Sequence, residues 1–247
     1  MYPTLENENL TNNPYIVGTF DDFEDKTVRK SFIRKTFAYF FSSILVTLSS
    51  CILFKFIPEC SKFAYTETGQ ALYTVSMITN FISIFTLICC GDLARKSPQK
   101  YILYYLFTFS LSYLIGMSVI RIPNDIVISA ILITTGITFN LTVYAIFTKS
   151  DFTDLSGYLI AVLMGLIITS IVNLFLHNSI LQIMIAGVGS ILFSCFIVYD
   201  VQMIVGNKHV KYKYNKDDYI FAALNLYLDV INLFLYVMEC LTLSQSN

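Results

Sequence analysis

Seven long apolar stretches dominate the chain and leave few folds open to it. We expect them at residues 36–57, 70–90, 100–120, 125–147, 156–176, 180–205 and 218–241. Each is close to the ~20 residues that a helix needs to cross the hydrocarbon core of a bilayer. Only 13% of the 247 residues are charged, against about 25% in ordinary soluble domains. The sequence therefore predicts an all-α membrane protein with seven transmembrane helices.

The polar segments are short, so the predicted domain organisation is simple. Residues 1–26 are polar and acidic and predict a disordered cytosolic tail. A basic segment then leads into the first span, which we expect to begin near Thr36, too far along the chain for a cleaved signal peptide. Residues 27–241 form one predicted transmembrane domain, and residues 242–247 a short C-terminal tail. The three residues 177–179 predict a tight hairpin, which makes the fifth and sixth helices antiparallel neighbours.

The distribution of basic residues predicts the orientation in the membrane. With a cytosolic N-terminus, 13 of the 16 Lys and Arg residues fall on the cytosolic side, and only Lys55, Lys62 and Arg121 fall on the other. Cytosolic loops of membrane proteins carry such an excess of Lys and Arg. Seven spans then place the C-terminus on the non-cytosolic side.

Two aspartates interrupt the last two apolar stretches. Asp200 lies near the cytosolic end of the sixth predicted helix and Asp229 in the seventh, at depths of roughly 10 and 15 Å at 1.5 Å per residue. A charge at the centre of a membrane helix costs about 2.5–3.5 kcal/mol on insertion scales, and intramembrane acids usually mark an ion or proton pathway. Two carboxylates at hydrogen-bond distance do not both ionise easily. We therefore expect the pair to share one proton.

The seventh predicted helix carries a polar face around its aspartate. Asn225, Asp229, Asn232 and Tyr236 follow one another at spacings of four, three and four residues, which places them on one side of a helix. Asn225 and Asn232 could join helices by hydrogen bonds or line an ion path, and the sequence leaves both open. Asp217 suits the positive end of a helix dipole, with a cytosolic vestibule for cations as the alternative.

Several classes of protein fit the chain poorly. An intramembrane aspartyl protease also uses two membrane aspartates, but it needs glycines before the second one, and here the sequence is LYLD. A zinc hydrolase lacks ligands, because both histidines lie in predicted loops and the cysteines show no metal-ligand spacing. The last helix has no lysine for retinal, and a receptor would need longer cytosolic loops. No basic face suggests nucleic acid, and no cofactor is expected.

The motifs around the two aspartates are specific enough to suggest a family. VYDVQMIVGNK followed by DDYIFAALNLYLDVINLFLYV resembles the signature of the Bax-inhibitor superfamily, particularly its lifeguard and Golgi anti-apoptotic branches. VRKSFIRKTFAYF resembles the entry to the first helix in the lifeguard branch. The resemblance covers roughly residues 27–241.

The resemblance implies a fold and a function. It implies a seventh helix that is central between two three-helix layers, and a pH-sensitive calcium leak from internal stores that is linked to suppression of cell death. It assigns Asp200 and Asp229 as the proton-sensing pair and Asp217 as an acid implicated in conduction. The endoplasmic reticulum or Golgi is the implied location, with other endomembranes and the plasma membrane left open. Apoptosis-related membrane proteins are the implied partners, besides lipid, calcium and protons.

Two points qualify what the resemblance implies. Some members pair the aspartates with an arginine in the second helix, but this chain has no Lys or Arg from Ala71 to Cys90. Calcium takes six to eight oxygen ligands, which Asp200 and Asp229 with Asn225 or Asn232 do not supply. We therefore expect any calcium bound by the pair to be weakly held and hydrated. A scaffold that inhibits cell death through protein partners, without ion flux, is the alternative function.

Overall fold

The computed structural model describes residues 26–89, 97–206, 214–215 and 217–245. Its long helices are α1 (Lys26–Phe56), α3 (Glu67–Cys89), α5 (Gln99–Ser118), α6 (Asn124–Phe147), α7 (Ser156–Leu176), α8 (Ser179–Val205) and α9 (Tyr219–Gln245). A short helix α2 (Pro58–Ala64) and the 3-10 turns η2 (Val119–Arg121) and η3 (Thr153–Leu155) lie between them. All seven long helices are long and apolar enough to cross a membrane. The prediction of an all-α protein with seven candidate spans is confirmed.

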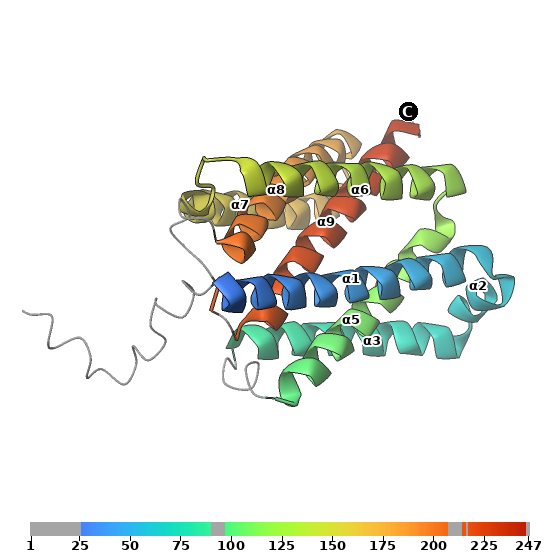
Figure 1. Cartoon of the computed structure of the whole chain (residues 1–247). Helices are drawn as coiled ribbons and strands as arrows, with labels where there is room; N and C mark the ends of the chain where they lie inside the picture. The colour runs from blue at the N-terminus through green and yellow to red at the C-terminus, as the bar shows by residue number, and fades with distance from the viewer. Residues whose placement is uncertain (1–25, 90–96, 207–213, 216, 246–247) are drawn as a thin grey trace, which may run out of the picture.

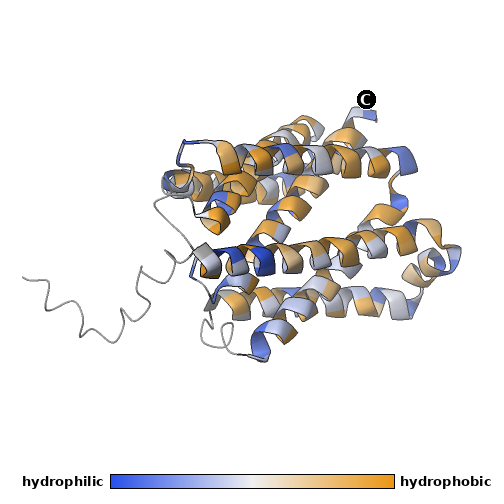
Figure 2. Ribbon diagram, viewed as in Figure 1, coloured by the Kyte–Doolittle hydropathy of each residue, from blue (hydrophilic) through white to orange (hydrophobic). Residues whose placement is uncertain are grey.

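The helices form two groups of three with α9 between them (Figure 1). In one group α5 packs against α1 and α3, and in the other α8 packs against α6 and α7. Helix α9 contacts α1 and α5 of the first group and α6 and α8 of the second. In the most apolar 18-residue window of α9, 67% of the residues are buried within the protein, against 11% in that of α7. Helix α9 is therefore enclosed by protein, whereas most of the apolar side chains of α7 are exposed. Figure 2 shows apolar residues along all of the long helices.

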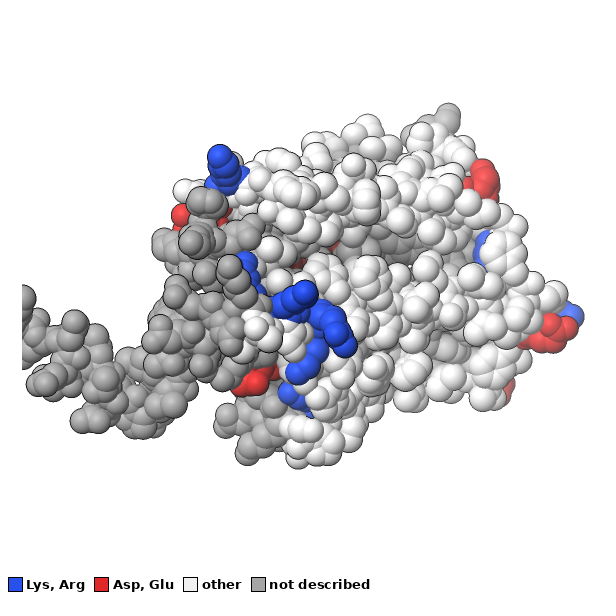
Figure 3. Space-filling view, in the orientation of Figure 1, with Lys and Arg blue, Asp and Glu red and all other residues white. Residues whose placement is uncertain are grey.

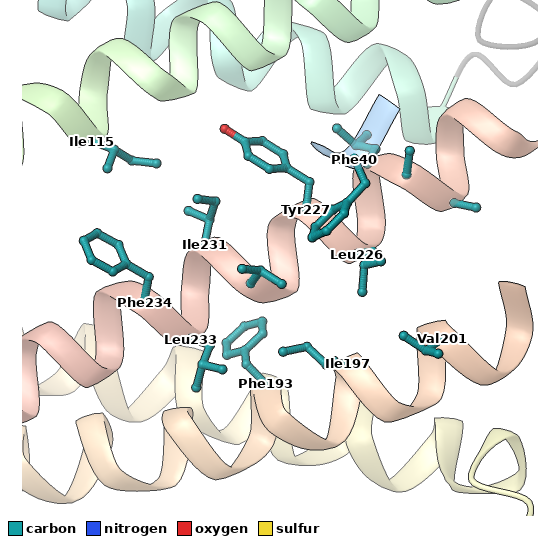
Figure 4. Close-up of a cluster of buried hydrophobic side chains, with 14 of the residues drawn as sticks. Phe40, Ile115, Phe193, Ile197, Val201, Leu226, Tyr227, Ile231, Leu233 and Phe234 are labelled. Carbon is teal, nitrogen blue, oxygen red and sulfur yellow. The ribbon is translucent and has the colours of Figure 1, made fainter. Parts of the chain in front are cut away.

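Apolar packing and a small hydroxyl network hold α9 in place. Figure 4 shows Leu233 of α9 against Phe193 and Ile197 of α8, with Tyr227 pointing to the opposite side. The Tyr227 hydroxyl lies 2.8 Å from Thr47 Oγ1 of α1, which in turn lies 2.9 Å from Ser112 Oγ of α5. Since a buried hydroxyl without a partner costs about 1–3 kcal/mol, this network fixes the positions of α1, α5 and α9 relative to one another.

The turns at the two ends of α8 are formed by residues that suit them. His177 adopts a left-handed conformation after α7, and the Asn178 side chain accepts a hydrogen bond of 3.1 Å from the backbone N–H of Leu181. The predicted hairpin at residues 177–179 is confirmed. At the other end, Gly206 has a φ of 55° and ends α8, a conformation that glycine adopts without a steric penalty.

The largest difference from the predicted boundaries is at the start of α1. The prediction placed the beginning of the first span near Thr36, but α1 begins at Lys26 and includes the basic segment as helix. Hydropathy marks where a helix enters the bilayer, whereas backbone hydrogen bonding continues through the charged turns outside it. Apart from Lys26, the predicted disordered tail at 1–26 lies outside the described residues. The same is true of most of the loop between α8 and α9.

Candidate functional site

The two aspartates meet where α8 and α9 pack against each other. Asp200 and Asp229 are 4% and 7% exposed, and their side chains are hydrogen-bonded to each other. A hydrogen bond between two carboxyl groups requires a proton on one of them. No Lys or Arg side chain contacts the pair within the described part of the chain, and α3 contains neither residue type.

The surroundings of the two acids differ. The Tyr214 hydroxyl donates a hydrogen bond of 3.3 Å to Asp200 Oδ1, and Asn225 Nδ2 donates one of 2.9 Å to the Tyr214 hydroxyl. Asp229 Oδ2 is buried and lacks a hydrogen-bond donor among the described residues. An ionised Asp200 is thus stabilised by a donor that Asp229 lacks, so the shared proton is better placed on Asp229.

Sequence reasoning missed Tyr214. This residue lies before α9 in a segment rich in lysine, which suggested an exposed loop, yet its side chain is only 8% exposed. Burial, followed by the neighbouring charge of Asp200, raises the pKa of the Tyr214 phenol well above its usual value. The hydroxyl therefore stays protonated at neutral pH and remains a donor. No local sequence signal distinguishes Tyr214 from an exposed loop tyrosine.

Gln202 was also missed, two residues after Asp200 in the YDVQ segment. Its amide oxygen accepts from the Phe152 N–H and its Nε2 donates to the Ser150 carbonyl, both at 2.8 Å. The side chain is only 2% exposed. These bonds tie the connection between α6 and α7 to α8, one turn from the acidic pair. Gln202 thus positions the C-terminal end of α8.

The other predicted site residues are placed as follows. Asn225 reaches the pair through Tyr214, whereas Asn232 Nδ2 donates to the Leu228 carbonyl of its own helix at 2.8 Å. Asp217 is exposed before α9, and its Cα lies about 18 Å along the helix from that of Asp229 at 1.5 Å per residue. The structure brings Asn225 into the site and leaves Asn232 and Asp217 outside it.

The pair supplies too few ligands to hold a resident metal ion tightly. In the part of the chain that the structure describes, no group of three or more His, Cys, Asp or Glu side chains could hold a metal ion. Calcium prefers six to eight oxygen ligands. The arrangement suits proton exchange, or passing contact with a hydrated cation, better than tight binding.

These features define a seven-helix membrane protein with an acidic pair enclosed between its last two helices. Residues 29–247 match the family described as "Inhibitor of apoptosis-promoting Bax1". The chain is 32% identical over 222 residues to "Protein lifeguard 3" of Mus musculus, covering 88% of this chain and 71% of that protein. It is also 32% identical over 222 residues to "Protein lifeguard 3" of Homo sapiens, covering 88% and 70%.

A plant relative extends the similarity. The chain is 30% identical over 220 residues to "Protein LIFEGUARD 4" of Arabidopsis thaliana, covering 87% of this chain and 85% of that protein. The chain belongs to the Bax inhibitor family, and its similarity is to the lifeguard proteins. The family resemblance that the sequence motifs suggested is confirmed.

Proposed function

We propose that the protein is a pH-sensitive calcium leak channel of an intracellular membrane, with the Asp200–Asp229 pair as its proton sensor. The observation that carries the proposal is the pair itself, two buried carboxyl groups on adjacent spans, with no basic residue beside them among the described residues. A buried carboxylate with a purely structural role is usually paired with a cationic side chain. A carboxyl pair without one changes its charge when the proton concentration changes.

The pair couples protons to helix packing. With one shared proton, the two side chains join α8 to α9 near the cytosolic side and keep this end closed. After that proton leaves, two negative charges face each other in a medium of low dielectric constant, and their repulsion either separates the helices or draws in a cation. Calcium fits because it prefers carboxylate, carbonyl and water oxygens, and the small number of protein ligands favours weak, hydrated binding. Weak binding suits conduction, since an ion must leave as easily as it enters.

The link to cell death comes from the family. The family description names inhibition of an apoptosis-promoting protein, and we propose the same role here. A leak in the endoplasmic reticulum or Golgi lowers the calcium that the store releases under stress. This gives the proposed channel a direct route to suppressing apoptosis. Contacts with apoptosis-related membrane proteins are the alternative route and require no flux.

Calcium flux from the purified protein in liposomes, measured across a pH series, tests the proposal. We expect a leak that rises as the pH increases through the range in which the pair loses its proton. Protein-free liposomes and the Asp200→Asn variant serve as controls. Absence of flux at every pH, together with retained suppression of cell death in cells, would favour the scaffold and rule out the channel.

A further inference from the structure

An apolar groove lies between α3 and α5 on the outer surface of the helical bundle. The two helices are in contact and cross obliquely (Figure 1), and the groove between them has a volume of about 710 Å³. From Tyr101 to Tyr113 it follows α5 for about 18 Å at 1.5 Å per residue. This length is close to the ~15 Å that one leaflet contributes to a hydrocarbon core of ~30 Å. Its walls include five exposed apolar side chains: Leu72 and Val75 of α3, and Ile102, Leu106 and Phe109 of α5. The groove therefore has the length and the lining that suit a lipid acyl chain.

One end of the groove meets a cluster of tyrosines and lysines. Tyr101 lines the groove, and its hydroxyl lies 2.6 Å from that of Tyr219 at the start of α9. The ammonium groups of Lys35 on α1 and Lys100 on α5 lie 5.3 and 4.4 Å from the centre of the Tyr219 ring. A cation within about 6 Å of a ring centre is attracted to the face of the ring. Tyr219 thus keeps two positive charges beside this end of the groove.

The two lysines have no acidic partner among the residues that the structure describes. Asp217 and Asp218 lie directly before Tyr219 in the sequence. Neither forms an ion pair with Lys35 or Lys100 within the described part of the chain. Lys100 is nevertheless only 8% exposed, and buried lysines are usually paired with an anion. We therefore expect the negative charge that balances Lys100 to come from outside the chain.

The lysines also lie at the depth of lipid headgroups. Lys35 directly precedes the predicted apolar stretch at residues 36–57, and Lys100 begins the one at residues 100–120. Figure 3 shows several Lys and Arg side chains together at this end of the molecule. In the expected orientation, this end meets the cytosolic leaflet, which carries anionic lipids.

We infer that the groove binds an acyl chain of an anionic phospholipid, and that Lys35 and Lys100 hold the headgroup of this lipid. The apolar walls suit the chain, and the unpaired lysines suit the negative charge. A soluble anion lacks the chain, and a zwitterionic lipid lacks the net charge. The site lies apart from the acidic pair of α8 and α9, so the inference goes beyond the proposed function and requires no ion flux.

The chain contains no tryptophan, which allows the groove to be tested by fluorescence. Phe109→Trp places a single fluorophore in the groove. Phe139→Trp on α6 is the matched control, because the two phenylalanines are 58% and 68% exposed and Phe139 lies outside the groove. Each variant is placed in phosphatidylcholine vesicles that contain a rising fraction of brominated phosphatidylserine, or of brominated phosphatidylcholine with the same acyl chains. Brominated chains quench a tryptophan that they contact, so the two titrations give the affinity of phosphatidylserine relative to phosphatidylcholine.

We expect this relative affinity to be about fivefold or more for Phe109→Trp, since one basic residue near an anionic lipid surface contributes roughly that factor. For Phe139→Trp we expect a value of about one. Equal relative affinities at the two positions would overturn the inference.

Replacing one lysine at a time tests the contact with the headgroup. In the Phe109→Trp protein, Lys35→Gln and Lys100→Gln should each lower the relative affinity several-fold, and Lys100→Arg should keep most of it. Lys149→Gln is the control, because Lys149 is exposed after α6 at the same expected side of the membrane, in the other group of helices. Lys35 is also exposed, so Lys35→Gln decides the outcome even where replacing the buried Lys100 impairs folding.

Three results of these titrations would contradict the lipid site. A relative affinity that survives both lysine substitutions would mean that the lysines do not hold the headgroup. An equal fall with Lys149→Gln would mean that the positive surface attracts anionic lipid without a specific site. Inorganic phosphate at constant ionic strength should leave the quenching unchanged, and loss of the preference for phosphatidylserine would mean that the lysines bind a free anion.

Discussion

At the scale of single residues, the two acids of the pair act as one titrating unit. Asp200 and Asp229 share a hydrogen bond, so replacing either carboxyl by an amide removes the repulsion of the doubly ionised state. An amide still bonds to the remaining acid. We therefore expect Asp200→Asn and Asp229→Asn each to fold and to conduct calcium at a rate that no longer depends on pH.

The flux–pH profile of each variant in liposomes checks this prediction. The basal rate can move in either direction, because an amide can hold the helices together or fit poorly and loosen them. The loss of pH dependence is the criterion. The double variant should match the single ones, since the two groups act together. A single variant with the profile of the unmodified protein would show that the pair is not the sensor.

Tyr214 gives a second prediction at this scale. Its hydroxyl donates to Asp200 and stays protonated because burial raises the pKa of the phenol. Tyr214→Phe removes a donor that stabilises the ionised form of the pair, so the pair should lose its proton only at a higher pH. We expect the midpoint of the flux–pH profile to rise by roughly half a unit to one unit, since one unit corresponds to about 1.4 kcal/mol.

Tyr236→Phe is the matched control for Tyr214→Phe. The Tyr236 ring stacks on Phe193 at 5.8 Å, and losing its hydroxyl leaves this stacking in place. We expect this control to keep the midpoint of the unmodified protein. A midpoint for Tyr214→Phe that is lower than that of the unmodified protein, or equal to that of Tyr236→Phe, would contradict the role assigned to Tyr214.

At the scale of helices, close contact between α8 and α9 depends on one glycine. A Cβ built on Gly189 of α8 would lie 2.8 Å from the ring of Tyr236 on α9, whereas one on Gly187 would meet nothing within 4 Å. Gly189→Ala should push the helices apart and lower the free energy of unfolding by about 1–3 kcal/mol. Gly187→Ala should be neutral or slightly stabilising. Thermal unfolding in detergent compares the two, and equal melting temperatures would argue against tight packing of α8 on α9 at this point.

The helices were largely predictable from the sequence because a bilayer requires apolar stretches of a defined length. All seven spans were expected, with α1 the main difference, since seven of its first ten residues are charged or polar and the segment lies outside the range that hydropathy detects. The meeting of Asp200 and Asp229 followed from their depths in adjacent helices. The contacts of Tyr214 and Gln202 were not predictable, because each depends on how separate elements pack and not on local sequence.

At the scale of the whole molecule, charged side chains lie at the two ends of the helices and leave the middle uncharged. Figure 3 shows Lys and Arg side chains grouped at the end where α1 begins, and a broad uncharged band across the middle. At the opposite end, Lys55 Nζ donates to the carbonyls of Val119 and Ile120, at 3.1 and 3.2 Å. These bonds hold the end of α1 to the turn between α5 and α6. The uncharged band matches the hydrocarbon core that seven spans require.

Membrane topology is the prediction at this scale, and it decides which compartment controls the acidic pair. Seven crossings with a cytosolic N-terminus put the loop around Lys208–Lys216 in the cytosol and Asn247 on the other side. A glycosylation acceptor on a short linker after Asn247 should be modified in the endoplasmic reticulum, and the same acceptor in the loop should not. The reverse pattern would mean that the protein has the opposite orientation in the membrane, and modification at both sites would mean that α9 does not cross.

With the expected pattern, Asp200 lies only five residues before the end of α8 at Val205, or about 8 Å at 1.5 Å per residue. Protons then reach the pair over the shorter distance from the cytosol, and cytosolic acidification should close the leak.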